Sequence, residues 1–533
     1  MSQHKKLYLS VSLALSMTSA QAEFDAELNL SDLTSATGLI INGINENDFS
    51  GFSVSAAGDI NGDGIDDVII GAFADPNGDI DAGSSYVVFG SDSGLPSSLN
   101  LSSLDGSNGF VINGVNEDDA SGISVSAAGD VNGDGIDDLI IGARNADPND
   151  NSNAGGAYVV FGSDTGLPNP LSLSSLNGSN GFVINGANAN DSSGESVSAA
   201  GDFNGDGIDD VIIGAALADP NGNLRAGSSY VVFGSDSGFP SFLNLSGLDS
   251  SSGFVINGVN AYDISGTFVG DAGDINGDGI DDVIIGASEA DPGGNTDAGS
   301  SYVVFGSDSG LQDSLDLSGL DGTNGFVING VNEDDESGVS VSAAGDFNGD
   351  GIGDVVIGTP DADPNGNSRA GSSYVVFGSD SGLPNPLNLS GLDGSSGFVI
   401  NGVNAGDESG FSVSVAGDVN GDGMDDLIIG ALNAEPDNNY SSGRSYVVFG
   451  SDSGLPNPLS LSSLNGSNGF VINGANAFDR SGTSVSAAGD VNGDGIDDVI
   501  IGARNADPNG NSSAGSSYVV FGSDIIFSNG FEG

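Results

Sequence analysis

Short apolar runs recur along the chain, each bounded by glycine and small polar residues. In one stretch four such segments follow one another: Ile123–Asp130, Asp138–Ala143, Ala157–Gly162 and Phe182–Gly186. Runs of this length, rich in Val, Ile, Phe and Tyr and separated by turn residues, are typical of β-strands. The pattern therefore predicts four consecutive strands in this part of the chain.

The four-strand pattern repeats. Its most regular part is the nine-residue motif D-x-N-G-D-G-x-x-D, which begins at Asp59 and recurs at Asp130, Asp202, Asp274, Asp346, Asp418 and Asp490. The first interval is 71 residues and the other five are 72. A fixed period of this length indicates a repeat architecture. Seven units of four strands predict an all-β fold, a seven-bladed β-propeller of four-stranded blades, over residues 39–522.

The ends of the repeat favour a closed ring over the alternative, a β-solenoid, whose coils are usually shorter. Leu39–Gly43 matches a fourth strand but precedes the first motif, whereas the seventh repeat ends after Tyr518–Gly522 without one. We expect the N-terminal strand to complete the last blade and so to pair the free sheet edges. The first strands, such as Ser124–Gly129, consist of small residues that suit the crowded centre of a ring, and the fourth strands are expected to lie outermost.

The nine-residue motif also places oxygen atoms at a spacing that suits calcium. Side chains at positions 1, 3, 5 and 9 and the carbonyl at position 7 can surround one ion, and glycines at positions 4 and 6 allow the sharp turn. The alternative is a plain hairpin turn. A turn needs no such cluster of carboxylates, which repel one another by ~1 kcal/mol per pair at 4 Å in water. We therefore expect about seven Ca²⁺ sites, one per blade.

The predicted ligands are the same in every repeat. The side chains are Asp59, Asn61, Asp63 and Asp67; Asp130, Asn132, Asp134 and Asp138; Asp202, Asn204, Asp206 and Asp210; Asp274, Asn276, Asp278 and Asp282; Asp346, Asn348, Asp350 and Asp354; Asp418, Asn420, Asp422 and Asp426; Asp490, Asn492, Asp494 and Asp498. The carbonyls are those of Ile65, Ile136, Ile208, Ile280, Ile352, Met424 and Ile496. Position 8 is Asp in six copies and Gly353 in the fifth, and we expect it to face solvent.

The first 22 residues have the composition of a secretory signal peptide. A basic start is followed by the apolar run Leu7–Met17 and by Ala20-Gln21-Ala22, a small-residue cleavage site. The run is too short to cross a bilayer. We expect cleavage near Ala22, a lead-in over residues 23–38, a C-terminal tail over 523–533, and a monomeric protein without a membrane span. Its location would be extracellular or periplasmic, secreted or on the cell surface.

The charge and composition of the chain limit which binding partners and which catalytic residues are expected. The chain has 75 Asp and Glu against eight Lys and Arg, and no Cys. Loss of residues 1–22 would leave six arginines and neither Lys nor His. Nucleic acid is therefore not expected as a partner, because both molecules are strongly negative. Asp-x-Ser-Gly occurs seven times, but no His or Lys is there to activate its serine, so no catalytic residue is predicted.

A calcium-dependent polysaccharide lyase or a carboxylate-pair glycosidase stays as the alternative function. A catalytic site should make one or two blades depart sharply from the repeat. The largest departure, Thr267–Asp271 in the fourth blade, is mild. The sequence therefore favours a binding module over an enzyme.

The order of a small-residue strand, D-x-N-G-D-G-x-x-D, an apolar strand ending in Gly-Ala, and Tyr-Val-Val-Phe-Gly resembles the FG-GAP repeat of integrin α-subunit heads and their bacterial relatives. The resemblance covers residues 39–522. The Phe-Gly of the family name is Ser-Gly here, beginning at Ser50-Gly51, and Gly358-Thr359-Pro360 comes closest to Gly-Ala-Pro. The resemblance implies metal loops on one face and ligand binding on the opposite face, at loops such as Ala74–Gly78 and Asn116–Gly122.

All six arginines fall in or beside the loops of that opposite face: Arg144, Arg225, Arg369, Arg444, Arg480 and Arg504. Three aromatic departures from the repeat, Tyr262, Tyr440 and Phe478, lie in the same loops. Our hypothesis is that this face binds an extracellular protein or polysaccharide, as an adhesion or ligand-binding module would. The alternative is that the arginines avoid the acidic metal loops and only pair with local carboxylates.

Overall fold

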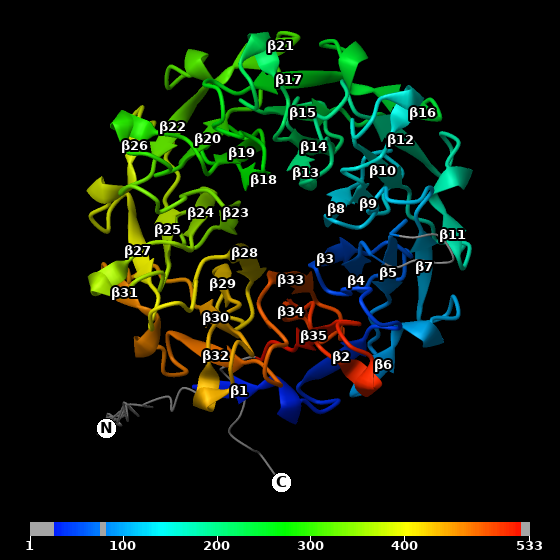
Figure 1. The fold of residues 1–533 in the computed structure, drawn as a ribbon, viewed down its shortest axis with the longest axis vertical. Coiled ribbons are helices and arrows are strands. Elements are labelled where there is room, and N and C mark those ends of the chain that lie inside the picture. The colour runs from blue at the N-terminus through cyan, green and yellow to red at the C-terminus, as the bar shows by residue number, and fades with distance from the viewer. Residues whose placement is uncertain (1–25, 75–80, 524–533) are drawn as a thin grey trace, which may run out of the picture.

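The computed structural model describes residues 26–74 and 81–523. Its strands form seven sheets set around a central axis, as Figure 1 shows. This confirms the predicted all-β, seven-bladed propeller. The predicted signal peptide, residues 75–80 and most of the C-terminal tail lie outside the described residues. No helix among those described is long and apolar enough to cross a membrane.

The first strand of every blade lies nearest the axis. These strands are β3 (Ser53–Gly58), β8 (Val125–Gly129), β13 (Val197–Gly201), β18 (Phe268–Gly273), β23 (Ser340–Gly345), β28 (Ser412–Gly417) and β33 (Ser484–Gly489). Small side chains let neighbouring first strands approach, so that Ser53 Oγ accepts the backbone N–H of Val125 in the next blade at 3.1 Å. The same bond links five further junctions, and Phe268 replaces the serine in the fourth blade.

The second and third strands form the buried middle of each blade. The second strands are β4 (Asp67–Ala72), β9 (Asp138–Gly142), β14 (Asp210–Ala215), β19 (Asp282–Ala287), β24 (Asp354–Thr359), β29 (Asp426–Ala431) and β34 (Asp498–Ala503). The third strands are β5 (Ser84–Val88), β10 (Gly156–Val160), β15 (Ser228–Val232), β20 (Ser300–Val304), β25 (Ser372–Val376), β30 (Arg444–Val448) and β35 (Ser516–Val520). Neighbouring blades cover both faces of these strands, which explains their unbroken apolar runs.

The fourth strands are β7 (Gly109–Asn113), β12 (Gly181–Asn185), β17 (Gly253–Asn257), β22 (Gly325–Asn329), β27 (Gly397–Asn401), β32 (Gly469–Asn473) and β2 (Gly38–Asn42). The last of these is the N-terminal strand. It pairs antiparallel with β35, from Gly38 opposite Val520 to Asn42 opposite Ser516. The predicted closure of the ring by the N-terminal strand is therefore confirmed, and Figure 1 shows β2 beside β35.

Each sheet has five strands, so the prediction of four-stranded blades with an outermost fourth strand was wrong. The fifth strands are β11 (Leu171–Ser172), β16 (Phe242–Asn244), β21 (Ser314–Asp316), β26 (Leu387–Asn388), β31 (Leu459–Ser460), β1 (Glu27–Asn29) and β6 (Ser98–Asn100). Each pairs in parallel with the fourth strand of the preceding blade, as β16 does with β12. The connection between a third and a fourth strand therefore covers the edge of the neighbouring blade.

Single 3₁₀ turns complete the connections. Those after the fifth strands are η1 (Leu30–Asp32), η2 (Leu101–Ser103), η4 (Leu173–Ser175), η6 (Leu245–Gly247), η8 (Leu317–Gly319), η10 (Leu389–Gly391) and η12 (Leu461–Ser463). Those between second and third strands are η3 (Pro148–Asp150), η5 (Pro220–Gly222), η7 (Pro292–Gly294), η9 (Pro364–Gly366), η11 (Pro436–Asn438) and η13 (Pro508–Gly510).

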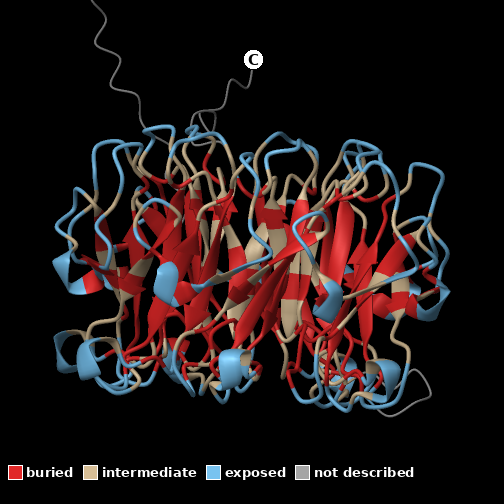
Figure 2. Cartoon of the chain, turned by 90° about the horizontal axis from the view of Figure 1, so that it is seen from above, coloured by how far each residue is buried: buried red, intermediate tan, exposed pale blue. Residues whose placement is uncertain are grey.

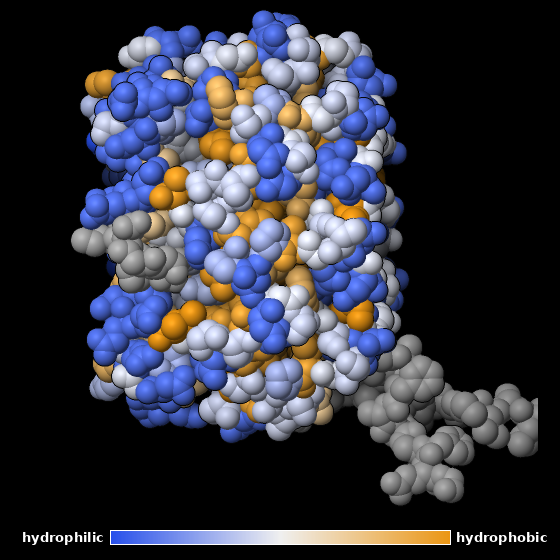
Figure 3. Space-filling model, turned by 90° about the vertical axis from the view of Figure 1, so that its right-hand side faces the viewer, coloured by the Kyte–Doolittle hydropathy of each residue, from blue (hydrophilic) through white to orange (hydrophobic). Residues whose placement is uncertain are grey.

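Burial divides the ring into a core and two loop-covered faces. In Figure 2 buried strands fill the middle of the disc, while exposed loops lie above and below them. The part of the outer wall seen in Figure 3 has hydrophilic residues along both rims and apolar residues between them. The functional question is therefore which of the two loop faces meets a ligand.

Candidate functional site

The carboxylate at position 1 holds each predicted metal loop in its turn. In the first loop Asp59 Oδ1 accepts the backbone N–H of Asp63 at 2.9 Å, and Oδ2 accepts that of Gly64 at 2.7 Å. Gly62 and Gly64 have φ values of 73° and 88°, which favour glycine. The other six loops repeat both bonds. The loops thus have the sharp turn that the motif predicts.

The carboxylate at position 9 lies below the loop and is fully buried. Asp67 is 0% exposed and accepts hydrogen bonds from the backbone N–H of Gly90 at 2.9 Å and the side chain of Asn61 at 3.0 Å. Burial first, and then the charges of Asp63 and Asp59, raise the pKa of Asp67 to about 8 against the hydrogen bonds from Gly90 and Asn61, which lower it. A buried carboxylate beside two others, with no arginine in the loop, is a group that a bound cation would neutralise.

The same cause acts in the remaining loops. Burial raises the pKa to about 8 for the position 9 carboxylates of five further blades, and well above the ordinary value for the sixth. These residues are Asp138, Asp210, Asp282, Asp354 and Asp498, and then Asp426.

By its chemistry the predicted donor set fits calcium, because every member is an oxygen: three carboxylates, one amide and one backbone carbonyl per loop. Within residues 26–74 and 81–523, no three Asp, Glu, His or Cys side chains gather closely enough to form a metal site by themselves. The amide of position 3 and the carbonyl of position 7 are therefore needed. Calcium binding at the seven loops stays a prediction.

We expected position 8 to face solvent. In the structure its carboxylate instead joins neighbouring blades. Asp137 Oδ2 accepts the backbone N–H of Asp59, which is position 1 of the preceding blade, at 2.8 Å. The same carboxylate touches Gly58, where an added Cβ would lie 2.3 Å from its Oδ2. Equivalent bonds occur at five other junctions, including Asp66 to Asp490 across the closure of the ring.

The junction between the fourth and fifth blades lacks this carboxylate. Gly353 has no side chain to offer Asp274, and its own backbone N–H instead donates to the Asp274 carbonyl at 3.2 Å. Asp271 stands in β18 where most blades have alanine, and its Oδ1 accepts the backbone N–H of Gly273 in the same strand at 2.8 Å. Space beside Gly273 is open, unlike that beside Gly58, so the Asp271 carboxylate does not take the place of the missing one.

The opposite face begins at the Asp-x-Ser-Gly turns. In the second blade Asp119 is buried, and its Oδ2 accepts the backbone N–H of Asn116 at 3.1 Å and its amide N–H at 3.0 Å. All six other blades repeat the amide bond, and five of them repeat the backbone bond. These carboxylates therefore fix turns, and the residue that follows each of them differs from blade to blade.

Those differences gather around one end of the central axis. Three positions per blade vary most: the second residue of Asp-x-Ser-Gly, the residue after its glycine, and the residue that follows the end of the second strand. In blade order they are Phe49, Phe52 and Phe73; Ala120, Ile123 and Arg144; Ser192, Glu195 and Ala216; Ile264, Thr267 and Ser288; Glu336, Val339 and Pro360; Glu408, Phe411 and Leu432; Arg480, Thr483 and Arg504. We call this the variable face.

A cavity of about 340 Å³ opens on the axis of the variable face, and all seven blades line it. Its lining mixes apolar and charged groups, among them Phe52, Phe411, Arg144, Glu195 and Arg504. Arg144 and Glu195 form an ion pair at 2.9 Å. The side chains thus differ from blade to blade around this cavity, where a ligand would contact all seven blades.

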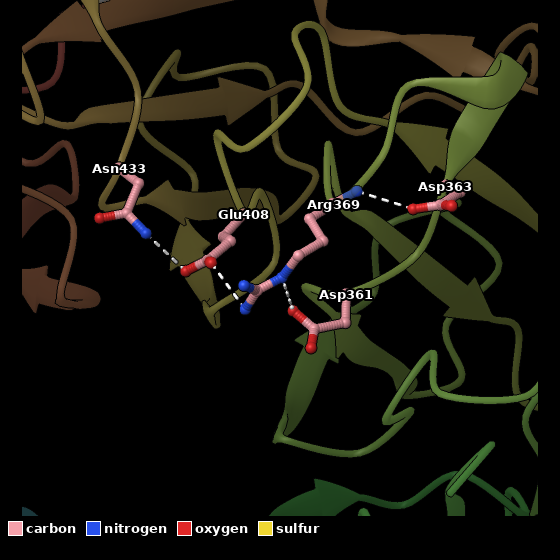
Figure 4. Close-up of polar contacts among 5 residues, drawn as sticks. All are labelled: Asp361, Asp363, Arg369, Glu408 and Asn433. Carbon is pink, nitrogen blue, oxygen red and sulfur yellow. Dashed lines mark hydrogen bonds and ion pairs between the residues drawn. The ribbon is translucent and has the colours of Figure 1, made fainter. Parts of the chain in front are cut away.

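The fourth, fifth and sixth blades give the variable face an acidic sector. Arg369 lies between two carboxylates, with Nε 2.8 Å from Asp361 Oδ1 and a terminal nitrogen 2.8 Å from Glu408 Oε1 (Figure 4). The Asn433 amide donates to the other oxygen of Glu408 at 2.7 Å. Burial raises the pKa of Glu336, and nearby carboxylates, first Asp361, raise it further.

The seventh, first and second blades give it a basic and aromatic sector. The guanidinium of Arg504 lies over the ring of Phe52, 5.2 Å from its centroid. Phe73 stacks with Phe49 at 5.8 Å and meets Phe52 edge to face at 4.8 Å. Burial lowers the pKa of Arg504, and Arg480 lowers it further. The two sectors make opposite sides of the axis chemically different.

The sequence located the arginines and the aromatic departures on this face but missed Phe49, Phe52, Phe73 and Phe411. These residues belong to positions that seem ordinary within one repeat. Comparison of the seven repeats, position by position, carries the signal, because the three variable positions change while the residues on either side of them stay constant.

Comparison with known proteins adds a repeat family. The profile described as FG-GAP repeat matches residues 121–160, 193–232, 268–304, 337–376, 409–448 and 481–520. Each matched segment runs from the start of a first strand, or just before it, to the end of a third strand.

Among curated proteins, integrin alpha-PS2 of Drosophila melanogaster is 33% identical over 199 residues, which are 37% of this chain and 12% of that protein. Integrin alpha-5 of Xenopus laevis is 29% identical over 245 residues, 44% of this chain and 20% of that protein. Phosphatidylinositol-glycan-specific phospholipase D of Rattus norvegicus is 33% identical over 175 residues, 33% of this chain and 19% of that protein. The chain thus matches a fifth or less of each relative's length.

A solved structure titled as BBS1N in complex with ARL6DN aligns over 95% of this chain and 99% of that one, with 9% identity and a TM-score of 0.42. That score is too low to carry an argument. The six repeat matches, the integrin alpha similarities and the seven-bladed ring together support an FG-GAP, integrin alpha-like β-propeller.

Proposed function

We propose that this propeller is a secreted, calcium-binding module for adhesion or ligand binding outside the cell, and that it binds an extracellular protein or polysaccharide through the variable face. One observation carries the proposal. The metal-loop face repeats almost without change, whereas the blade-specific arginines, aromatic residues and carboxylates gather on the face opposite. Selection for stability alone would not concentrate differences around one opening.

The remaining parts of the proposal have separate support. Calcium is supported by the all-oxygen donor set and by the buried carboxylates at position 9. Secretion is supported by the composition of residues 1–22. A ligand-binding role agrees with the integrin alpha similarities. The phospholipase D similarity covers only 19% of that enzyme, and we propose no phospholipase activity from it.

The first test is a binding panel. The protein, in millimolar calcium, is incubated with neutral and acidic polysaccharides and with extracellular proteins, and its depletion from solution is measured. Absorbance of unsaturated sugar products is followed in the same samples. We expect depletion by at least one member without products; product formation would show a lyase instead.

A triple variant tests whether the variable face binds the ligand. Replacing Arg225, Arg369 and Arg480 by Ser should weaken capture of the ligand found in the panel at least tenfold, because arginine contributes strongly to binding surfaces. The melting temperature should change little, since Arg369 is half exposed and no ion pair of Arg225 or Arg480 is present among the described residues. Unchanged capture would assign the ligand to another surface.

A further inference from the structure

A continuous strip of blade-specific side chains runs from the rim of the variable face to the axial cavity. It consists of Tyr440, Phe478, Arg480, Arg504 and Phe52, and we call it the arginine strip. The residues come from the sixth, seventh and first blades. No single repeat contains the strip, and the ring has to close before it exists.

Backbone hydrogen bonds fix the segments of the strip side by side. The N–H of Phe478 donates to the carbonyl of Tyr440 at 2.8 Å, and the N–H of Arg480 donates to the carbonyl of Ser441 at 3.1 Å. The next segment joins through Asn505, whose N–H donates to the carbonyl of Asp479 at 3.3 Å. The strip is therefore a fixed arrangement of backbone with variable side chains on it.

Neither arginine of the strip contacts a carboxylate directly. In the described part of the chain neither Arg480 nor Arg504 forms an ion pair or a side-chain hydrogen bond, although Asp and Glu number 75. Burial raises the pKa of Glu408 and the charge of Arg480 opposes that rise, but Arg369 and Asn433 already bind this carboxylate. Two neighbouring guanidinium groups that no carboxylate contacts form a site for one, because arginine binds carboxylates through two parallel hydrogen bonds.

The aromatic end of the strip is exposed and flat. Tyr440 and Phe478 are 62% and 64% exposed, and their rings stack at 6.5 Å with 11° between planes. Phe478 also has a φ of 68°. Equivalent residues in other blades are Asn47, Asp118, Asn190, Asp334 and Gly406, which are types that tolerate this conformation, and Tyr262, whose φ is 74°. A phenylalanine is strained there, and its ring lies exposed rather than packed in the core.

The combination points to one class of ligand. A stacked aromatic pair suits the apolar C–H face of a sugar ring, and the adjacent arginines suit a carboxylate on it. A protein partner would need about 800 Å² with an apolar centre, but the described residues expose only five large hydrophobic side chains over the whole molecule. A polyanion would meet long-range repulsion from a chain of net charge −67.

We propose that the arginine strip binds a sugar unit bearing one carboxylate within an otherwise neutral glycan. Arg480 and Arg504 bind the carboxylate, and Tyr440 and Phe478 pack against the sugar ring. The inference rests on the proposed function, since it names the ligand class and the part of the variable face that recognises it.

The test compares two oligosaccharides that differ in one acidic group. Aldotetraouronic acid is a xylotriose that carries one 4-O-methylglucuronate, and xylotriose is its neutral counterpart. Their Kd values are measured by ligand-observed NMR in millimolar calcium, with the full-length secreted protein. We expect the acidic sugar to bind at least tenfold more tightly. Replacing Arg480 and Arg504 by Ser should abolish that difference.

Matched variants control for charge and for the aromatic surface. Replacing Arg225 and Arg369 by Ser removes the same charge from the same face and should leave the ratio of the two Kd values within twofold of wild type, because neither arginine belongs to the strip. Tyr440→Ser with Phe478→Asn should weaken both sugars at least threefold, whereas Tyr262→Asn, the equivalent change at the rim of another blade, should have no effect. Melting temperatures within a few degrees of wild type would show that each variant folds.

Several results would overturn the inference. Equal binding of the two sugars, no binding of either, or an unchanged preference in the Arg480 and Arg504 variant would each do so. Tighter binding of the peptide acetyl-Gly-Glu-Gly-amide through the same arginines would assign the strip to a protein partner instead. Capture of another member of the panel, lost in the triple variant but kept in the Arg480 and Arg504 variant, would leave the proposed function standing without the strip.

Discussion

The two loop faces of the ring are built from the same seven blades but serve different purposes. On the metal-loop face the motif positions 1, 3, 5 and 9 are the same in all seven blades, and position 8 carboxylates link neighbouring blades at six of the seven junctions. On the variable face three positions per blade change in charge, size and aromatic character. A repeat can therefore keep one edge constant for assembly while the other diversifies.

The contrast also holds within the hydrogen-bond pattern. The metal-loop face holds its carboxylates with backbone N–H groups of its own loop and of the neighbouring blade. The variable face holds the buried Asp of each turn, such as Asp119, in the same way, while the adjacent side chain has different contacts in different blades, as with Glu408, which Arg369 and Asn433 bind. Changes on the metal-loop face should alter stability, and changes on the variable face should alter binding.

Removal of calcium should give the largest effect. A ligand that binds only the folded state stabilises it by about 2.7 kcal/mol per site at a hundredfold excess over Kd. With an unfolding entropy of about 2.1 cal/mol/K per residue, seven sites correspond to a fall in Tm on the order of 20 °C. Calorimetry with and without chelator measures it. An unchanged Tm, with elemental analysis showing that the metal is gone, would show that calcium does not stabilise this face.

The pH dependence of the chelated protein should be opposite to that of the calcium-loaded protein. Burial raises the folded-state pKa of Asp67 and its counterparts to about 8, above the ordinary value of 3.8. A raised carboxylate pKa contributes stability below pH 4 that is lost as pH rises through 8. In excess chelator Tm should therefore fall by several degrees between pH 5 and pH 8.

With calcium, protons and metal compete for the same oxygens, so Tm should rise over that interval. Melting curves in the two conditions provide the measurement. The same direction of change in both would show that these carboxylates do not bind the metal.

The exception between the fourth and fifth blades offers a smaller, more local test. Asp271→Ala removes the acceptor of the Gly273 N–H and should destabilise by about 1 to 2 kcal/mol. Gly353→Asp restores position 8, and the open space beside Gly273 can receive its carboxylate, so this variant should be at least as stable as wild type. Thermal or denaturant unfolding measures both changes. A loss with Gly353→Asp as large as that with Asp271→Ala would show that a carboxylate at position 8 does not join these blades.

Loss of the Arg369 ion pairs should have the smallest effect. Its side chain is 56% exposed, and exposed ion pairs contribute about 0 to 1 kcal/mol. Arg369→Ser should therefore leave Tm within about 1 °C of wild type, whereas Asp137→Ala, on the metal-loop face, should lower it more. A larger fall in Tm with Arg369→Ser than with Asp137→Ala would contradict the conclusion that the metal-loop face contributes more to stability than the variable face.

Sequence reasoning predicted the ring because the information is periodic. Seven copies of one motif gave the blade count, and the extra strand-like segment Leu39–Gly43 gave the closure that β2 and β35 confirm. The fifth strands escaped prediction because segments such as Ser98–Asn100 are three residues long and pair with the preceding blade. No pattern within one repeat identifies such a partner.

The prediction from sequence missed the role of position 8 for the same reason. Asp137 lies 78 residues from Asp59, so the bond between them is invisible within a repeat. The single glycine at Gly353 suggested an unconstrained, solvent-facing position. The open space beside Gly273, which a carboxylate fills at the other junctions, becomes evident only once the two blades are placed side by side.

The closure of the ring has a mechanical consequence. β2 and β35 are antiparallel, so Gly38 and Val520 leave the sheet at the same end of the pair. A force pulling the two chain ends apart would first strain the three residue pairs of β1 with β32 and then unzip the seam one bond at a time. Such a force would therefore open the ring at this closure.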